Sequence, residues 1–379
     1  MGFESIIKEN QNWIEDTFKK LDNKLSKTAI KSRYKIPYSV KDGVHNDMSK
    51  VDIAWWTNGF WGGLMWLMYN ATGNPEYQST ARESEKILVK AFEQNIDGLH
   101  HDVGFMYHLV SGASYRLTGN KNSRTVNLIA AMMLASRYNV KGEFIRAWNI
   151  PDSEGWTIID GMMNIPLLYW ASKELGDDRF KHIAVKQADM CLRDHVRDDD
   201  TINHIVMHDL NVPGKVIGTK GGQGYGEGSC WSRGQSWAVY GFILSYIHTK
   251  DKKYLEVAKR VADLFIKETE KTDWLPRVDF RQPETPLKYD STAGVIAACG
   301  IIEIAKALSG EESKKYLTAA VNMLKAMENS WCDWSDDNDS ILQMGCEEYH
   351  YGVQKNIIYG DFYFTEAILK LKGSDFLIW

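Results

Sequence analysis

Cysteine and proline are scarce in this chain of 379 residues, which contains only 5 and 8 of them. The cysteines are odd in number, widely spaced and without a CxxC pair, so neither a disulfide framework nor a thiolate zinc site is indicated. No Pro- or Ser-rich stretch and no change of composition interrupts the chain, although its length would suit two average domains. We therefore expect residues 1–379 to form a single domain whose cysteines are free thiols.

An excess of basic residues is also missing. The chain has 45 Lys and Arg against 50 Asp and Glu, a net charge of −5 at pH 7. This balance argues against a nucleic-acid-binding protein, which needs a basic face, and an acidic ligand would need cations placed locally. The first residues are charged where a signal peptide is apolar, and Ile6 stands where a myristoylation signal needs Ser or Thr. We expect a cytoplasmic protein that binds neither nucleic acid nor membrane.

Apolar residues, by contrast, are plentiful. The chain is 44% hydrophobic and 25% charged, which provides a large core and excludes general disorder. Apolar residues recur at intervals of three and four, whereas the alternating pattern of half-buried strands is scarce. The first such stretch contains Ile6, Ile7, Trp13, Ile14, Phe18 and Leu21. The sequence therefore predicts a mainly α-helical protein.

One turn pattern recurs along the chain, at residues 69–81, 115–128, 171–185, 245–258 and 306–320. Each copy has a helix that ends in Gly or a basic residue, a few polar residues, and a new amphipathic helix, as in an αα-hairpin. The pattern predicts helices near 5–22, 59–72, 76–94, 105–118, 123–138, 161–175, 178–196, 233–248, 251–270, 291–309, 311–328 and 361–371.

The first and last of these helices have no hairpin partner. An open array of hairpins needs polar caps at both ends, whereas a ring needs none. The last helix, in the segment YGDFYFTEAILKL, is as aromatic as the internal ones. We therefore pair it with the first helix and predict an all-α fold, a closed toroid of six αα-hairpins.

Longer loops separate the expected hairpins, at roughly 23–58, 95–104, 139–160, 197–232, 271–290 and 329–360. Such loops in a compact domain are often functional, and in a ring of hairpins they all emerge at one end. Four motifs lie where a long loop meets the next helix, so we expect them to form one site. These motifs are DIAWWTNGFW (52–61), HHDVGFMY (100–107), IIDGMMN (158–164) and SCWSRGQSW (229–237).

Asp102 and Asp160 are the candidate catalytic acids. Each precedes an expected helix, so each could instead be an N-cap that accepts a hydrogen bond from a free backbone N–H. Both, however, have apolar neighbours, among them Phe105, Met162 and Met163. Apolar surface removes solvation and raises the pKa of the carboxyl that is less well hydrogen-bonded. Two acids in unequal surroundings are typical of proton transfer at neutral pH.

Trp56, Trp148 and Trp237 lie on loops or first helical turns, where their rings would suit a half-wet, sugar-stacking surface. The alternative for each is a core residue. Arg233 stands between two Trp residues, where its planar fork could bind a substrate carboxylate through two hydrogen bonds. The alternative is an Arg that ties the loop to backbone carbonyl groups.

No metal or phosphate site is indicated. His204 and His208 have a spacing that could suit a metal on a helix, but no HExxH motif or third ligand accompanies them. A hydrogen-bonding or proton-handling role is the better interpretation of His204. The Gly-rich stretch 218–229 matches neither phosphate-binding pattern, so we interpret it as backbone that passes close to a ligand.

The ordered set of motifs resembles the unsaturated glucuronyl hydrolases, glycoside hydrolase family 88, over roughly residues 40–370. The motifs are WWTNGFW, HHDVGF, IDGMMN, the pair NH before GQGY, SCWSRGQSW, and IYGDFYFTEAIL. The resemblance implies an α/α six-hairpin barrel that removes a 4,5-unsaturated uronic acid from the non-reducing end of lyase-generated oligosaccharides, such as those from hyaluronan, chondroitin or heparin. It also implies that water adds across the C4=C5 vinyl ether, and it implies no metal or organic cofactor.

The resemblance assigns roles by position. Asp160 matches the acid/base, and Asp102 matches the second essential Asp. The substrate-contacting positions match Trp56, His101, Phe105, Trp148, His204, Gln223, Arg233 and Trp237. In the segment 349–356, where relatives that favour sulfated substrates carry a Ser/Lys cluster, this chain has only Lys355 and Tyr residues, so sulfate preference stays open.

Two alternatives are kept. One is an unsaturated rhamnogalacturonyl hydrolase acting on pectin fragments, which shares the toroid. The motifs HDVGF and RGQSW favour glucuronyl substrates instead. The other alternative is a non-enzymatic, glycan-binding toroid that uses the same tryptophans. The sequence leaves the oligomeric state open.

Overall fold

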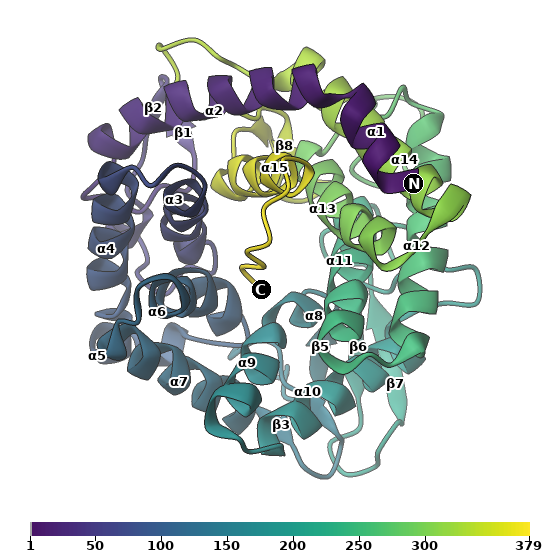
Figure 1. The fold of residues 1–379 in the computed structure, drawn as a ribbon. Helices are drawn as coiled ribbons and strands as arrows, with labels where there is room; N and C mark the ends of the chain where they lie inside the picture. Colours follow the sequence, from purple (N-terminus) through teal and green to yellow (C-terminus); the bar gives the residue numbers. More distant parts are fainter. Residues whose placement is uncertain (1) are drawn as a thin grey trace.

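The computed structural model describes residues 2–379, which form a closed ring of paired helices (Figure 1). The inner segments are α3 (Asn58–Thr72), the π-helix η3 (Gly104–Gly112) continued by α6 (Ala113–Thr118), α8 (Gly161–Asn164) continued by α9 (Pro166–Leu175), α11 (Ser232–Thr249), α13 (Ser291–Ala307) and α15 (Ile358–Leu371). The outer helices are α4 (Pro75–Leu88), α7 (Lys121–Ser136), α10 (Arg179–Met190), α12 (Lys252–Glu270), α14 (Gly310–Trp331) and α2 (Gln11–Lys31). The short helix α1 (Gly2–Glu9) packs on α14.

The last helix closes the ring, as the sequence predicts. α15 contacts both α3 and α13 in the inner ring and α2 on the outside (Figure 1). The predicted end of the first helix is wrong, since α2 continues to Lys31 instead of stopping near residue 22. Leu25 and Ala29 continue its buried face at helical spacing, and each is at most 1% exposed. The first long loop is correspondingly shorter.

The recurring turn joins inner to outer helices through a left-handed residue and a cap. Gly73 and Gly119 each have φ near +71°, and the next residues, Asn74 and Asn120, accept hydrogen bonds from the first N–H groups of α4 and α7. Glycine adopts this conformation without a Cβ clash, and Asn is among the best N-caps. Lys250 ends α11 in the same conformation, with φ +62°.

Small residues let the inner helices approach closely. A Cβ on Gly59 of α3 would lie 2.0 Å from the carbonyl oxygen of Phe105 in η3, and one on Gly241 of α11 would lie 2.4 Å from Cβ of Met162. Any larger residue would push these helices apart. The segment after α15 turns back into the ring, where the Trp379 ring stacks on Tyr363 at a centroid distance of 5.8 Å.

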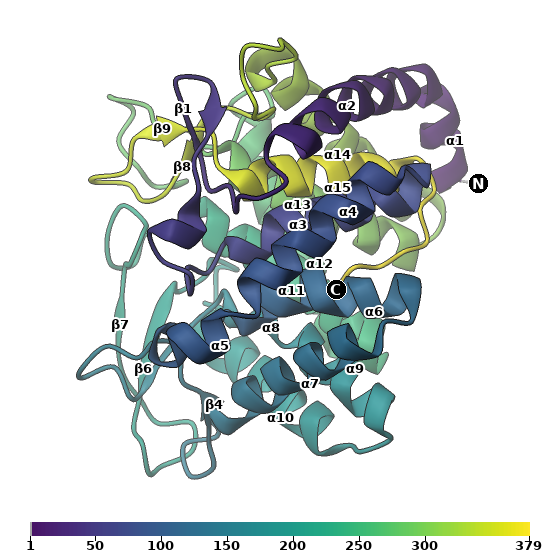
Figure 2. The ribbon, with the colours of Figure 1, turned by 90° about the vertical axis from the view of Figure 1, so that its left-hand side faces the viewer.

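The long loops gather at one end of the ring, opposite the N-terminus (Figure 2). They carry short strands: β1 (Val40–Lys41) pairs with β2 (Val44–His45), β3 (Tyr138–Asn139) with β4 (Phe144–Ile145), and β8 (Gly345–Cys346) with β9 (Gln354–Lys355). β5 (Trp156–Ile158), β6 (Ile205–His208) and β7 (Val216–Lys220) form an antiparallel sheet. None of the helices in residues 2–379 has the length and apolarity needed to cross a bilayer.

Candidate active site

A cavity of about 600 Å³ is lined by residues of the long loops. Its wall brings together three of the four predicted motifs, because Trp56, Asp102 and Asp160 all line it. The complete lining is Asp52, Ala54, Trp55, Trp56, Asp97, Gly98, His100, Asp102, Trp148, Asn149, Ile150, Ile158, Asp160 and Gln223. None of these lining residues is Lys or Arg, so the cations expected for an acidic ligand do not form this wall.

Asp102 is held by an amide and is almost completely buried. Its side chain accepts a hydrogen bond of 2.9 Å from Nδ2 of Asn164, whose Oδ1 accepts one from the backbone N–H of Phe105. Burial raises the pKa of Asp102 well above its ordinary value, and the charge of Asp160 adds to the rise, whereas the Asn164 hydrogen bond opposes it. Burial therefore disfavours the charged form of the Asp102 carboxyl.

Asp160 lies at the end of the three-stranded sheet, next to His204. The pairing of Ile158 with Ile205 places the residues just beyond β5 and before β6 side by side, and Oδ2 of Asp160 lies 3.5 Å from Nε2 of His204. The backbone N–H of Gln223 donates to Nδ1 of His204, so the neutral ring carries its proton on Nε2, facing Asp160.

Neither acid acts as a helix cap. Asp160 occupies the N-cap position of α8 but its side chain makes no capping hydrogen bond, and the one hydrogen bond recorded for the Asp102 carboxyl within residues 2–379 comes from Asn164. The capping alternative therefore does not explain either residue. Both carboxyls are instead buried, at 6% and 8% exposure, beside one cavity.

Several buried polar atoms around the two acids have no hydrogen-bond partner within residues 2–379. They are Nδ1 of His100, Nε2 of His101, Oδ2 of Asp160 and Nε2 of His204. A buried polar group without a partner costs roughly 1–3 kcal/mol, and such groups are rare in folded proteins. Their clustering indicates a preformed site for a polar ligand.

The predicted aromatic residues fall into two groups. Trp56 and Trp148 are half-buried and line the cavity, as a sugar-stacking surface requires. Phe105 and Trp237 are fully buried behind it, with their ring centroids 5.3 Å apart. The alternative interpretation of Trp237, as a core residue, is the one that its position supports.

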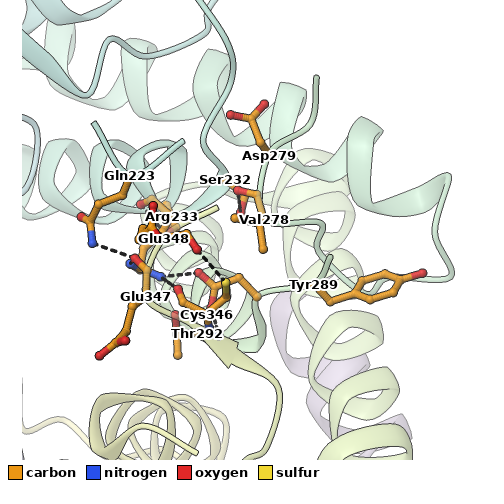
Figure 3. Close-up of polar contacts among 12 residues, drawn as sticks. Gln223, Ser232, Arg233, Val278, Asp279, Tyr289, Thr292, Cys346, Glu347 and Glu348 are labelled. Atoms are coloured by element: carbon orange, nitrogen blue, oxygen red, sulfur yellow. Dashed lines mark hydrogen bonds and ion pairs between the residues drawn. The ribbon is translucent and has the colours of Figure 1, made fainter. Parts of the chain in front are cut away.

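Arg233 is also buried, at 1% exposure, and is tied to a loop (Figure 3). Its Nη1 donates to the carboxylate of Asp290 and to the carbonyl oxygen of Cys346, and its Nη2 donates to the carbonyl oxygen of Glu347 at 2.6 Å. The guanidinium also lies over the Trp231 ring, 4.6 Å from its centroid. This is the loop-tying arrangement kept as the alternative, while direct contact with a substrate carboxylate stays a prediction.

Gln223 shares the same loop. Its Nε2 donates to the carbonyl oxygen of Glu347 at 2.7 Å (Figure 3). Its backbone carbonyl oxygen accepts from the backbone N–H of Tyr349. Gln223 lines the cavity, so the segment 346–349 is fixed to the cavity wall by two predicted site residues, Arg233 and Gln223.

Sequence reasoning missed Asn164, Trp55 and Asn149. Asn164 follows Asp160 by four residues, a helical spacing that could have drawn attention to it as a polar partner. Trp55 and Asn149 adjoin predicted site residues in the chain and line the cavity with them. The buried partner of Arg233, Asp290, gave no comparable signal.

Comparisons with known proteins show the family of this chain. Residues 29–373 match Glycosyl Hydrolase Family 88. The unsaturated glucuronyl hydrolase of Bacillus sp. (strain GL1) is 34% identical over 332 residues, 84% of this chain and 86% of that protein. The unsaturated chondroitin disaccharide hydrolase of Streptococcus pyogenes serotype M1 is 31% identical over 376 residues, covering 97% and 94%.

The fold comparison gives the same result. The crystal structure of the unsaturated glucuronyl hydrolase of Bacillus sp. GL1 superposes with a TM-score of 0.86 at 31% identity, over 93% of this chain and 96% of that one. The predicted six-hairpin toroid is thereby confirmed. The chain belongs to glycoside hydrolase family 88 and is a hydrolase of unsaturated uronates from lyase-derived oligosaccharides.

Proposed function

We propose that the protein releases 4,5-unsaturated uronic acid from the non-reducing end of glycosaminoglycan oligosaccharides by hydrating the C4=C5 vinyl ether. The observation that carries this proposal is the pair of buried carboxyls, Asp102 and Asp160, held differently beside one cavity. The glycosaminoglycan class rests on the relatives, among which are chondroitin disaccharide hydrolases.

The reaction begins with proton transfer from Asp160 to C4. The π electrons of the double bond take up this proton, and the ring oxygen stabilises the positive charge at C5. Water adds at C5 and returns a proton to Asp160. The resulting hemiketal opens at the ring C5–O bond, and the hemiacetal left at C1 collapses to an aldehyde and expels the aglycone as an alcohol. The carboxylate-spacing rule for ordinary glycosidases does not apply, because C5 and not C1 is attacked.

The surroundings of the two acids support this division of roles. Asp160 has an unpartnered Oδ2 and a facing N–H from His204, so it can exchange a proton with the ligand. Asp102 differs from it, because burial raises its pKa and Asn164 fixes the orientation of its carboxyl. We assign Asp160 as the acid/base and Asp102 as its supporting acid.

Substrate contacts follow from position. Trp56, Trp148 and Gln223 line the cavity and contact the sugar. His101 and His204 are not part of this lining but lie within 3.5 Å of the two acids, and we propose that they reach the sugar there. Phe105, Trp237 and Arg233 support the residues of the cavity wall and do not contact the sugar themselves, since all three are at most 1% exposed.

A panel of lyase-generated disaccharides tests the proposal. Unsaturated chondroitin and hyaluronan disaccharides should lose the absorbance of their conjugated double bond when the protein is added. Activity on the unsaturated pectin product alone would replace the proposal with rhamnogalacturonyl hydrolysis. Binding without any loss of absorbance would indicate a glycan-binding protein, since binding leaves the double bond intact.

A further inference from the structure

Three potential metal ligands converge where η3 begins. Nδ1 of His100, Nε2 of His101 and one carboxyl oxygen of Asp102 all lie within 4.8 Å of one another. Each of the two imidazole nitrogens is 3.4 Å from Oδ2 of Asp102. Zinc binds such atoms at about 2.0–2.2 Å in a tetrahedron, which puts neighbouring ligand atoms roughly 3.4 Å apart. The distances from the two imidazole nitrogens to Oδ2 of Asp102 therefore already equal the spacing that a zinc site requires.

The same atoms are not used in holding the fold together. Neither imidazole nitrogen has a hydrogen-bond partner within residues 2–379, although the His101 side chain is only 3% exposed. Each nitrogen lies 3.4 Å from a carboxyl oxygen, beyond the usual hydrogen-bond distance of about 2.7–3.2 Å.

The surroundings suit a bound cation. Asn164 orients the Asp102 carboxyl through its other oxygen, at 2.9 Å, which is the outer support that metal-binding carboxylates usually have. His100 and Asp102 line the cavity, so a fourth ligand position faces the space for substrate. The nearby Asp160 carboxyl favours a cation, whereas the Arg137 guanidinium opposes it.

We propose that His100, His101 and Asp102 form a binding site for a zinc-like divalent cation, and that the bound cation inhibits the enzyme. Two imidazoles and one carboxylate favour Zn²⁺ or Co²⁺ over Mg²⁺ or Ca²⁺, which prefer oxygen ligands. His100 and Asp102 line the cavity, so the bound cation occupies space that the substrate needs and engages the carboxyl that supports Asp160. The inhibition rests on the proposed function, whereas the binding does not.

Calorimetric titration of the metal-free protein with ZnCl2 tests the binding. One equivalent should bind to the wild-type protein, and His100→Ala and Asp102→Asn should each weaken it at least about tenfold. His100→Gln serves as a second variant if His100→Ala does not fold. His182→Ala, at an exposed site on α10, is the matched control and should bind as wild type. Absence of stoichiometric binding, or wild-type affinity in folded His100 variants, would overturn the proposal.

Cobalt supplies a spectroscopic readout that does not depend on activity. Addition of CoCl2 should produce a visible d–d absorption band in the wild-type protein that Zn²⁺ abolishes and that the His100 variants lack, while MgCl2 should give no effect. In the activity assay, Zn²⁺ should inhibit the wild-type enzyme reversibly with EDTA, and the His100 variants should need at least about tenfold more Zn²⁺. Binding without inhibition would refute the inhibitory role alone.

Discussion

Asp102 and Asp160 differ in how each carboxyl is held, and this difference determines what their substitution should do. Asp160→Asn removes the group that exchanges a proton with the ligand but keeps its shape, so kcat should fall by about 10²–10⁴-fold while substrate still binds. Measurements of turnover and of equilibrium binding with the same disaccharide check this expectation. Retention of more than a few per cent of the wild-type kcat would remove Asp160 from the acid/base role. Asn164→Asp, which changes the hydrogen-bond partner of Asp102 and keeps the Asp160 carboxyl, is a useful comparison.

Arg233 could anchor the loop or bind the substrate carboxylate, and one substitution distinguishes these roles. If it anchors the loop, Arg233→Ala leaves the buried carboxylate of Asp290 unpaired, and the free energy of unfolding should fall by about 3–5 kcal/mol. A substrate clamp would instead raise KM with little effect on stability. Urea unfolding and KM measured on the same variant separate the two. The matched control is Arg281→Ala, whose ion pair with Asp199 is exposed and should contribute at most about 1 kcal/mol.

For individual residues, the sequence predicts which residue types form the site better than it predicts their exposure. Asp102, Asp160 and Trp56 reach the cavity because a loop-to-helix junction ends at each of them. Trp237 and Arg233 lie in an equally promising motif, yet α11 turns both into the interior. The direction of a side chain on a first helical turn depends on where neighbouring helices stand, and no local pattern encodes that.

The sheet that carries Asp160 and His204 is held by a buried chain of hydrogen bonds centred on Thr157. Nδ1 of His195 faces the carbonyl oxygen of Asn203 at 2.8 Å and must donate to it, so Nε2 accepts from the Thr157 hydroxyl at 2.9 Å. Nε2 of His208, also 2.9 Å from that hydroxyl, must then be the donor. These hydrogen bonds link β5, which leads to Asp160, with β6.

Thr157→Val should disturb this sheet without changing its packing volume. The substitution leaves one ring nitrogen of His195 and one of His208 without partners, at a cost of roughly 1–3 kcal/mol each. We expect lower stability in urea and a kcat reduced about tenfold at nearly constant KM, because Asp160 loses its fixed position. Thr157→Ser keeps the hydroxyl and should restore kcat. Wild-type kcat in Thr157→Val would show that the chain does not position the acid.

Helices were easier to predict than strands in this fold. The Thr-Gly-Asn turns at Gly73 and Gly119 encode a left-handed C-cap and an N-cap in neighbouring residues, so those hairpins are locally specified. Strands β5 and β6 span three and four residues, too few for an alternating pattern to be recognised. Their pairing joins segments nearly fifty residues apart and depends on the closed ring.

Closure of the ring also explains why so many histidines are buried. The pKa of His45 falls from 6.5 to about 4 and that of His195 to about 3, chiefly through burial, and His100, His208 and His248 fall to about 4. The folded protein keeps these rings neutral, whereas the unfolded chain protonates them below about pH 6.5. Burial raises the pKa of Asp102 and that of Asp361, the latter to about 6; these two carboxyls have the opposite effect on stability but are outnumbered.

The protein should therefore lose stability steeply as the pH falls from 6.5 towards 4. In that range the unfolded chain binds more protons than the folded one, and each extra proton lowers the free energy of unfolding by about 1.4 kcal/mol per pH unit. Urea unfolding between pH 4.5 and 7.5 measures the slope, and we expect an uptake of at least about two protons near pH 5. His45→Gln should reduce that uptake by about one proton, whereas exposed His182→Gln should leave it unchanged. A flat profile over this range would mean that the buried histidines are protonated in the folded ring, which their burial argues against.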